Sequence, residues 1–262
     1  MQHATQSIQH TTQSITLVKV GGARLRTAHD LVSLAKYISG LRDAGQNVLV
    51  VHGGGPEISE FHEQLNVPFE KMDGLRVTTP QGMTLTTMVL CGLVNKRIVA
   101  SLLANRVPAF GLSGVDGRIL RSTFLDQKRY GYVGTPPEVS ADLLHLLMSA
   151  GHVPIVAPVS LGPDGTPINV NADDAAHAIA RAMHVDSLDF ISDIPGVKGH
   201  DDAVIPTVRS GELDTLILDE VVTGGMIPKL RGAALAVNSG VGRVRIGDLA
   251  GMLHDTATVV CS

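Results

Sequence analysis

Short apolar runs alternate with helical patterns from residue 15 onward, and this alternation limits the fold more than any other feature of the sequence. Residues 15–20, 48–51 and 153–157 are rich in Val, Ile and Leu, which is typical of strands buried on both faces of a sheet. The helical segments between strands place apolar residues three and four positions apart. Parallel strands need such crossover helices, so the pattern predicts an α/β fold with a mainly parallel central sheet.

The same patterns place the individual elements. Helices are predicted at about residues 27–44, 56–65, 81–105, 140–150, 173–183 and 225–238. Further strands are predicted at residues 109–112, 168–171, 188–191, 244–246 and 258–260. Hairpins are predicted at residues 68–79, where Asp73-Gly74 is a turn signal, and at 117–134. No repeat or low-complexity linker divides the chain, so we expect two lobes on one continuous sheet.

Size and composition favour a protein that folds unaided and binds a small molecule. Of the 262 residues, 44% are hydrophobic, which is enough for the core of one large domain or two small ones. The net charge of -4 and the lack of Trp argue against broad nucleic-acid binding. Cys91 and Cys261 are too few for a disulfide framework or a Cys-based zinc site, and the 11 histidines form no metal-binding pair.

Hydropathy along the chain predicts a cytoplasmic location. No apolar stretch approaches the length that we expect of a membrane span. Residues 1–14 are polar and lack the apolar segment of a signal peptide, so we interpret them as a polar N-terminal extension.

Glycine lies beside lysine at several predicted strand and helix ends, a pattern suited to phosphate. One strand ends in Lys19-Val20-Gly21-Gly22, the next in His52-Gly53-Gly54-Gly55, and a later helix carries Lys229 after a glycine pair. Glycine lets the main chain approach a ligand, and its amides suit phosphate oxygens. The sequence has no Gly-x-x-x-x-Gly-Lys-Ser/Thr loop, and no Gly-x-Gly-x-x-Gly opens a helix. A phosphoryl group in transfer spreads negative charge over its oxygens, which the two lysines would neutralise.

Seven segments, taken in order, resemble a known family. They are Lys19-Val20-Gly21-Gly22, His52-Gly53-Gly54-Gly55-Pro56-Glu57, Gly74-Leu75-Arg76-Val77-Thr78, Val94-Asn95-Lys96, Asn169-Val170-Asn171-Ala172-Asp173, Ser192-Asp193, and Gly224-Gly225-Met226-Ile227-Pro228-Lys229. Their order resembles that of the N-acetylglutamate kinases of the amino acid kinase superfamily, over nearly the whole chain after residue 15. The resemblance implies a three-layer α/β/α sandwich. It also implies that ATP and Mg²⁺ are used to phosphorylate the side-chain carboxylate of N-acetyl-L-glutamate in arginine synthesis.

The resemblance implies three catalytic residues. Lys19 and Lys229 would stabilise the transferred phosphoryl group from opposite sides. The Asp173 carboxylate would lie between the two lysines and keep both ammonium groups charged and aimed. No general base is needed, because the attacking carboxylate has a reference pKa of about 4.3 and is already ionised at neutral pH.

On the nucleotide side, the resemblance implies contacts from Gly21 and Gly22 to phosphate oxygens, together with Lys229. Asp193 would lie close to the Mg²⁺ ion, which would be held mainly by phosphates and water, so no protein metal ligands are expected.

On the acceptor side, the resemblance assigns Gly54, Gly55, Arg76 and Asn169. The amide of Gly54 would hold phosphate oxygens, and Gly55 would bind the amino acid. The Arg76 guanidinium would form a forked pair with the α-carboxylate of the acceptor. Asn169 would hold the α-carboxylate or the acetamido group.

Ordinary structural roles remain open for several of these residues. A lysine at a strand end is usually solvated, although an unpaired charge inside a buried strand is costly. Asp173 is also placed to cap the helix that it begins, and that role is compatible with the catalytic one. Arg76 alone would be read as an ordinary hairpin charge. Asn95-Lys96 is more typical of a structural or interface pair than of catalysis.

The ends of the chain and one loop depart from the family pattern. Ile194-Pro195-Gly196 follows Asp193 where many relatives have an acidic residue, and residues 254–258 differ from the usual ending. Residues 1–14 lack a helical apolar stripe, so we expect an arginine-insensitive homodimer. We assign residues 15–168 to an N-terminal lobe that binds the amino acid and forms the dimer interface. Residues 169–262 would form a C-terminal lobe that binds ATP.

Two rival functions remain open from the sequence. A sister enzyme that phosphorylates aminoadipate or glutamate on an acidic carrier protein would need a basic rim at the cleft. Such a rim is available at Arg118, Arg121, Lys128 and Arg129. A non-catalytic sensor of nucleotide or amino acid is the other alternative, but a pure binder has no need of two opposed lysines.

Overall fold

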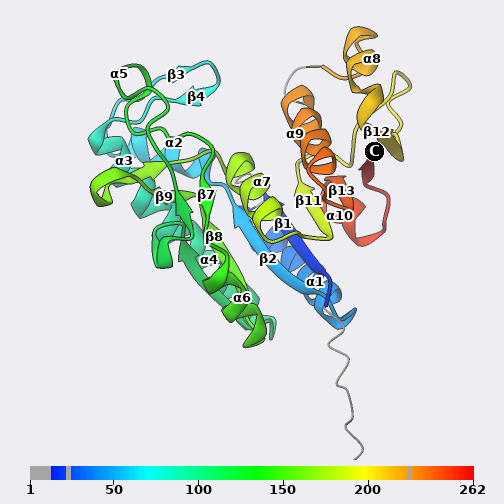
Figure 1. The fold of residues 1–262 in the computed structure, drawn as a ribbon, viewed down its shortest axis with the longest axis horizontal. Coiled ribbons are helices and arrows are strands. Elements are labelled where there is room, and N and C mark those ends of the chain that lie inside the picture. Colours follow the sequence, from blue (N-terminus) through cyan, green and yellow to red (C-terminus); the bar gives the residue numbers. More distant parts are fainter. Residues whose placement is uncertain (1–12, 22–24, 224–225) are drawn as a thin grey trace, which may run out of the picture.

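Eight strands form one continuous central sheet in the order β12-β14-β13-β11-β1-β2-β8-β5 (Figure 1). The computed structural model describes residues 13–21, 25–223 and 226–262. The strands are β1 (Ile15–Val20), β2 (Asn47–His52), β5 (Ala109–Ser113), β8 (Val153–Ala157), β11 (Ser187–Ile191), β12 (Thr207–Arg209), β13 (Arg243–Gly247) and β14 (Thr258–Cys261). Neighbouring strands are parallel except for the antiparallel pair β13 and β14. The mainly parallel sheet is therefore confirmed.

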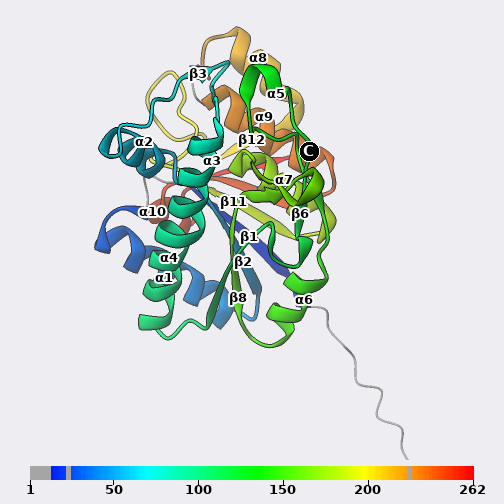
Figure 2. The same cartoon turned by 90° about the vertical axis from the view of Figure 1, so that its left-hand side faces the viewer.

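Helices cover both faces of this sheet and give three layers (Figure 2). One face is covered by α1 (Ala28–Asp43), α4 (Asn95–Ala104) and α10 (Leu249–Leu253), and the other by α6 (Asp142–Ser149), α7 (Ala172–Ala182) and α9 (Met226–Asn238). Alternate residues of β1 supply the two cores, since Leu17 packs into one and Val18 into the other. The α/β/α sandwich is confirmed.

The strand order changes direction at β1, which fixes where a ligand fits. β1 lies between β2 and β11, so the chain winds one way from β1 through β2 and the other way through β11. In open α/β sheets, the crevice at the carboxyl ends of such strands is the usual ligand site. Lys19 and the glycines after His52 lie at this edge.

Local signals set the helix boundaries as the sequence predicts. The Thr27 hydroxyl accepts the N–H of Asp30 and caps α1. Gly45 follows that helix with φ of +80°, a conformation that favours glycine. Pro56 lies in the first turn of α2 (Gly55–Gln64), where a missing N–H leaves no hydrogen bond unmade.

The longest helix spans Pro80–Ala104 and contains a π-helical turn. Its parts are α3 (Pro80–Thr87), η2 (Met88–Val94) and α4. By length and composition this helix is able to cross a membrane, so the expectation that no apolar stretch approaches that length is wrong. Its inner side, including Val94 and Ile98, packs in the core of the sandwich. Core helices of soluble proteins pass the same test, so the helix is weak evidence for a membrane span.

Two smaller sheets are separate from the central sheet. The hairpin β3 (Lys71–Met72) and β4 (Leu75–Arg76) turns at Asp73 and Gly74, which both have positive φ, as predicted. The second sheet has the order β10-β9-β6-β7. Its strands are β6 (Leu120–Arg121), β7 (Glu138–Val139), β9 (Val159–Leu161) and β10 (Pro167–Asn169).

The hairpin predicted at residues 117–134 is present but extends to residue 139, since β6 pairs antiparallel with β7 and Phe124 forms an antiparallel bridge with Gly134. That stretch contains β6 and a helical turn, α5 (Gln127–Tyr130). The Asp126 carboxylate accepts two backbone N–H groups of the turn, and Gly131 ends it with φ of +67°. Other elements were also not predicted, because they are too short to show a periodic pattern: η3 (Asp116–Arg118), η4 (Pro163–Gly165), β12, η5 (Ser210–Glu212), α8 (Leu213–Leu218) and α10.

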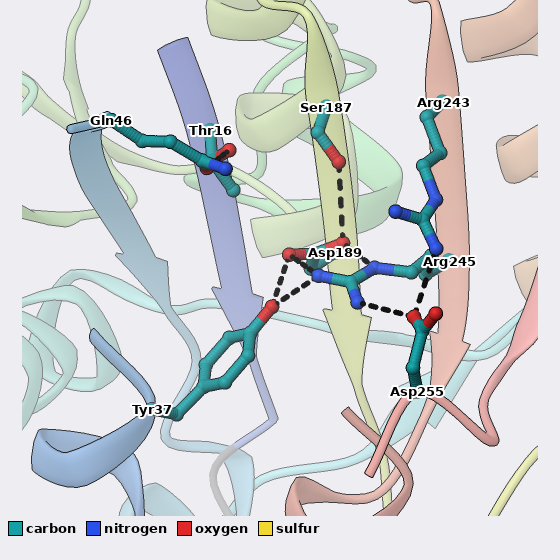
Figure 3. Close-up of polar contacts among 8 residues, drawn as sticks. All are labelled: Thr16, Tyr37, Gln46, Ser187, Asp189, Arg243, Arg245 and Asp255. Atoms are coloured by element: carbon teal, nitrogen blue, oxygen red, sulfur yellow. Dashed lines mark hydrogen bonds and ion pairs between the residues drawn. The ribbon is translucent and has the colours of Figure 1, made fainter. Parts of the chain in front are cut away.

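A buried ion pair between β11 and β13 also binds helix α1 (Figure 3). Asp189 of β11 is fully buried and lies in register with Arg245 of β13. The Arg245 Nε and Nη2 atoms each donate to one Asp189 oxygen at 2.7 Å. Tyr37 of α1 donates its hydroxyl hydrogen to Asp189 Oδ2 at 2.5 Å and also contacts Arg245. Burial and the nearby Asp189 charge raise the pKa of Tyr37, so the phenol stays protonated.

Candidate functional site

A cavity of about 480 Å³ opens at the carboxyl edge of the central sheet. Its walls come from the glycine loop after β2, the β3–β4 hairpin, the end of β10 and the start of α7. The predicted site residues that line it are Gly54, Gly55, Arg76, Asn169 and Asp173. Residues distant in sequence therefore meet where the strand order predicts a ligand.

Lys19 and Asp173 form an ion pair at the edge of this cavity. Lys19 of β1 is only 9% exposed, and its Nζ lies 2.6 Å from Asp173 Oδ1. The carboxylate offsets the cost of placing the ammonium group inside a buried strand. The capping role considered for Asp173 belongs instead to Asn171, whose side chain accepts the Asp173 N–H at 2.7 Å. The Asp173 carboxylate is thus available to Lys19.

Lys229 joins a second polar group at the end of β11. Its Nζ donates to Ser192 Oγ at 3.1 Å and lies 3.8 Å from Asp193 Oδ1. Within the described part of the chain, Lys229 contacts these residues and not Asp173. The expected placement of Asp173 between both lysines is therefore seen for Lys19 alone.

Ser192 is a site residue that sequence reasoning named only as part of a motif. Its hydroxyl bridges the Lys229 ammonium group and the Asp193 carboxylate, to which it donates at 3.2 Å. The available signal was a Ser-Asp pair directly after a buried strand.

The two polar groups are adjacent because their strands are adjacent. Lys19 is in register with Phe190, so Ser192 follows β11 at the level where β1 ends. The Gly21 N–H donates to the Ile191 carbonyl at 3.3 Å and fixes the spacing there. The predicted contact of Gly21 with nucleotide stays a prediction. Gly22, predicted to bind phosphate, lies outside the described residues, as do Gly224 and Gly225.

Arg76 lines the cavity and carries one unmet donor. Its Nη2 donates to Ser59 Oγ at 2.6 Å and to the Gly55 carbonyl at 3.2 Å, and the guanidinium lies 4.1 Å from the centre of the Phe69 ring. Burial lowers the pKa of Arg76. Its Nη1 is buried and has no hydrogen-bond partner among the described residues. An unmet buried donor is costly, so a carboxylate ligand at this point would be stabilising.

Asn169 joins two walls of the cavity. Its Nδ2 donates to Thr78 Oγ1 at 3.1 Å, and the Thr78 hydroxyl donates to the Arg76 carbonyl at 2.9 Å. These two hydrogen bonds hold β4, the strand that carries Arg76, against β10. Asn169 therefore supports the position of Arg76 in addition to lining the cavity itself.

Gly54 is required by close packing against the long helix. A Cβ at this position would lie 2.5 Å from Leu90 Cδ2 in the π-helical turn. We expect Gly54→Ala to destabilise the protein by about 1–3 kcal/mol, because Leu90 is buried and its displacement overpacks the core. Urea unfolding followed by circular dichroism would measure this loss.

The control for that substitution is Gly55→Ala, since a Cβ at Gly55 meets nothing within 4 Å. It should change the free energy of unfolding far less than Gly54→Ala. Equal losses in the two variants would contradict the packing argument.

The side chains offer no dedicated metal cage. Among the described residues, no group of three or more His, Cys, Asp or Glu side chains is placed to hold a metal ion. The Asp193 carboxylate, 3.8 Å from Lys229, is 69% exposed. Such a site fits a cation that arrives with its own oxygen ligands better than one held by protein alone.

Comparison with known proteins identifies relatives over most of the chain. A model of the Amino acid kinase family matches residues 14–248. The acetylglutamate kinase of Methanopyrus kandleri is 43% identical over 253 aligned residues, covering 93% of this chain and 99% of that protein. The structure of smu.665 from Streptococcus mutans UA159 has a TM-score of 0.82 and 32% identity, covering 94% of this chain and 98% of that one.

A more distant structure supports the fold alone. Carbamate kinase from Giardia lamblia bound to AMP-PNP has a TM-score of 0.71 at 15% identity, with 96% of this chain and 99% of that chain covered.

Proposed function

The chain belongs to the amino acid kinase family, and from this we propose that it transfers the γ-phosphoryl group of ATP to the side-chain carboxylate of N-acetyl-L-glutamate. The observation that carries the proposal is the meeting of a lysine-carboxylate pair and an unmet guanidinium donor in one cavity. A phosphoryl acceptor with a second carboxylate satisfies both groups. Identity of 38–43% with several acetylglutamate kinases supports this substrate.

The acceptor is held by its α-carboxylate. The Arg76 guanidinium binds that group, while Asn169 and the glycine loop line the space for the rest of the molecule. The fixed guanidinium plane, supported by Ser59 and Phe69, orients the acceptor before reaction. Its side-chain carboxylate is then directed at the glycine loop.

The chemical step needs charge neutralisation and no proton transfer. A side-chain carboxylate oxygen of the acceptor forms the new P–O bond, and the bond from the γ-phosphorus to the bridging oxygen breaks to release ADP. The attacking carboxylate is already ionised. Lys19 stabilises the charge that develops on the phosphoryl oxygens, and Asp173 keeps the Lys19 ammonium group in place.

The nucleotide side is formed by Lys229 with Ser192 and Asp193. Lys229 would neutralise the phosphates of ATP from the side opposite Lys19. Mg²⁺ would neutralise phosphate charge when bound, and the exposed Asp193 carboxylate is available to its water ligands. Gly21 and Gly22 remain proposed contacts for the phosphates. Gly54, Gly55 and Arg76 support an acceptor lobe at residues 15–168, and Lys229 with Ser192 and Asp193 supports an ATP lobe at residues 169–262. Asn169 and Asp173 reach the acceptor cavity from the second lobe.

A homodimer and a cytoplasmic location complete the proposal. Large apolar side chains are exposed along the outer side of the long helix and on the neighbouring edge strand β5: Met88, Leu93, Leu103 and Phe110. Such a patch supports burial against a second copy. The use of ATP supports a cytoplasmic site of action. We also propose that the enzyme is insensitive to arginine.

The carrier-protein alternative loses support from the structure. Two of the residues that would form its basic rim are already paired, since Arg121 lies 2.8 Å from Glu138 and Arg129 lies 2.7 Å from Asp73. Less positive charge then remains for an acidic carrier. The lysine-carboxylate pair likewise favours an enzyme over a sensor.

The direct test is ADP release with Mg-ATP and four acceptors in parallel. They are N-acetyl-L-glutamate, glutamate, aspartate and N-acetyl-aminoadipate. We expect turnover with N-acetyl-L-glutamate alone, and trapping by hydroxylamine as the acyl hydroxamate. Turnover restricted to another acceptor, or none with any of them, would overturn the proposed substrate.

A further inference from the structure

A buried polar chain lies directly behind the glycine loop and is not used by the reaction described above. It consists of His52, the last residue of β2, and Asn95, the first residue of α4, both fully buried. Asn95 Nδ2 lies 3.2 Å from His52 Nε2, and His52 Nδ1 lies 2.9 Å from the Gly53 carbonyl oxygen. These hydrogen bonds therefore connect the long helix to the Gly53–Gly54 peptide, which begins the glycine loop.

The surroundings of Asn95 fix the direction of every hydrogen bond. One amide atom of Asn95 faces the backbone carbonyls of Ile155 at 2.8 Å and Leu112 at 3.3 Å, which only accept, so it is the nitrogen. The other amide atom faces the Lys96 ammonium group at 3.1 Å, which only donates, so it is the oxygen. Asn95 therefore presents its amide nitrogen to His52 as well, and the two carbonyls and His52 Nε2 share its two hydrogens.

This arrangement selects one tautomer of His52. Its Nε2 accepts from Asn95, so the proton of the neutral ring is on Nδ1, where it is donated to the Gly53 carbonyl. Burial lowers the pKa of His52 to about 4, and the ring is neutral under ordinary conditions. A charged ring would place a second donor against the Asn95 amide nitrogen.

The Gly53 carbonyl in turn fixes the direction of the Gly54 N–H. The peptide bonds of the described residues are trans, so the C=O of Gly53 and the N–H of Gly54 point in opposite directions across one plane. With the carbonyl held against the His52 ring, the N–H points away from it. Gly54 lines the cavity, and its N–H has no acceptor among the described residues.

Two further residues hold Asn95 in place. Lys96 Nζ bridges Asn95 Oδ1 and the Gly111 carbonyl, each at 3.1 Å. A Cβ at Gly111 would lie 2.1 Å from Asn95 Oδ1, so glycine in β5 leaves the space for this contact. The Asn95 amide thus has one orientation in which its oxygen faces a donor and its nitrogen faces acceptors.

We infer that Asn95 is a positioning residue: acting through His52, it holds the Gly53–Gly54 peptide so that the Gly54 N–H faces the reacting groups. This inference rests on the proposed function, in which that amide binds phosphate or acceptor oxygens. It gives Asn95-Lys96, interpreted from sequence as a structural or interface pair, a role in the reaction.

The test is Asn95→Leu, which keeps the size of the side chain and removes the donor to His52. We expect kcat/KM for N-acetyl-L-glutamate to fall by about 100-fold, as for a misplaced reacting group. In ¹⁵N spectra the His52 ring should change from the Nδ1–H tautomer, and the Gly54 amide signal should shift. The matched control is Leu102→Ala, a buried change farther along α4 that should lower stability without altering either signal or the turnover of folded enzyme.

A second pair of variants tests whether His52 transmits the effect of Asn95 to the Gly53–Gly54 peptide. The amide nitrogen of an asparagine lies where the Nδ1 of histidine lies, whereas that of a glutamine reaches the Nε2 position. His52→Asn should therefore retain more activity than His52→Gln. Equal activity in the two variants, or a loss in Asn95→Leu no larger than in Leu102→Ala, would overturn the inference.

The spectra also separate this inference from the proposed function. If wild-type enzyme fails to turn over N-acetyl-L-glutamate, the proposed function fails. The His52 tautomer and the Gly54 amide signal need no turnover. Unchanged signals in Asn95→Leu would overturn the inference, and their change would support the inferred control of the loop peptide.

Discussion

Replacing Lys19 with methionine is expected to lower kcat by about 10²–10³-fold, the usual cost of removing one preorganised group that stabilises transition-state charge. Methionine keeps the apolar stem that fits the buried strand, so the fold should be retained. The KM for the acceptor should change little, because Arg76 holds the α-carboxylate and Lys19 acts on the phosphoryl group. Steady-state kinetics would measure both constants, and calorimetry would measure acceptor binding.

Two further variants sharpen the interpretation of that loss. Lys36→Met removes an exposed lysine of α1 and should leave kcat unchanged. Asp173→Asn should lower kcat less than Lys19→Met, and combining the two should add little, because Asp173 acts through the Lys19 ammonium group. A Lys19→Met enzyme with normal kcat would contradict the role given to this lysine.

Replacing Arg245 with leucine is expected to destabilise the fold by about 3–5 kcal/mol, the cost of breaking a buried ion pair from one side. The substitution leaves the fully buried Asp189 carboxylate with Tyr37 and Ser187 as its hydrogen-bond donors (Figure 3). Urea unfolding would show the loss as a lower midpoint. A second change, Asp189→Leu in the same chain, should recover part of the loss because no buried charge then remains.

Arg243 provides a matched comparison on the same strand. It pairs with Asp255 at 2.9 Å, and both side chains are about half exposed or more. Arg243→Leu should cost less than about 1 kcal/mol, as is usual for a solvated ion pair. Similar losses for Arg243→Leu and Arg245→Leu would show that burial of the Asp189 pair does not set its contribution.

The fold was predictable because its main elements carry local signals. β1, β2 and β8 are short apolar runs, and α1 begins at a Thr cap and ends before a glycine. The missed elements lack such signals: α10 has five residues, and the turn at Tyr130 depends on an Asp126 cap inside a sequence that alternates like a hairpin. The π-helical turn has no sequence pattern of its own.

Site residues that stand out by their own type and position could be predicted from the sequence. Contacts between side chains of distant segments could not. Lys19, Arg76 and the glycines stand out by their position at strand ends or turns. The Ser192 contact with Lys229 depends on two segments 37 residues apart, and the Arg245 pair with Asp189 on segments 56 residues apart. No local sequence pattern indicates these contacts, because the order of the strands in the sheet brings the residues together. The assigned roles of the site residues stay predictions.

The π-helical turn has a consequence for insertions and deletions in the longest helix. Such a turn holds one more residue than an α-turn, so removing one residue from Met88–Val94 would let the turn tighten to α-helical geometry with little rotation of the helix after it. Removing one residue from α3, which has no extra residue to lose, would instead rotate everything after it by about 100°. Asn95 would swing away from His52, and the row of apolar side chains on the outer surface would turn with it. A one-residue deletion in α3 would therefore disturb both the loop behind the cavity and the outer face of the helix.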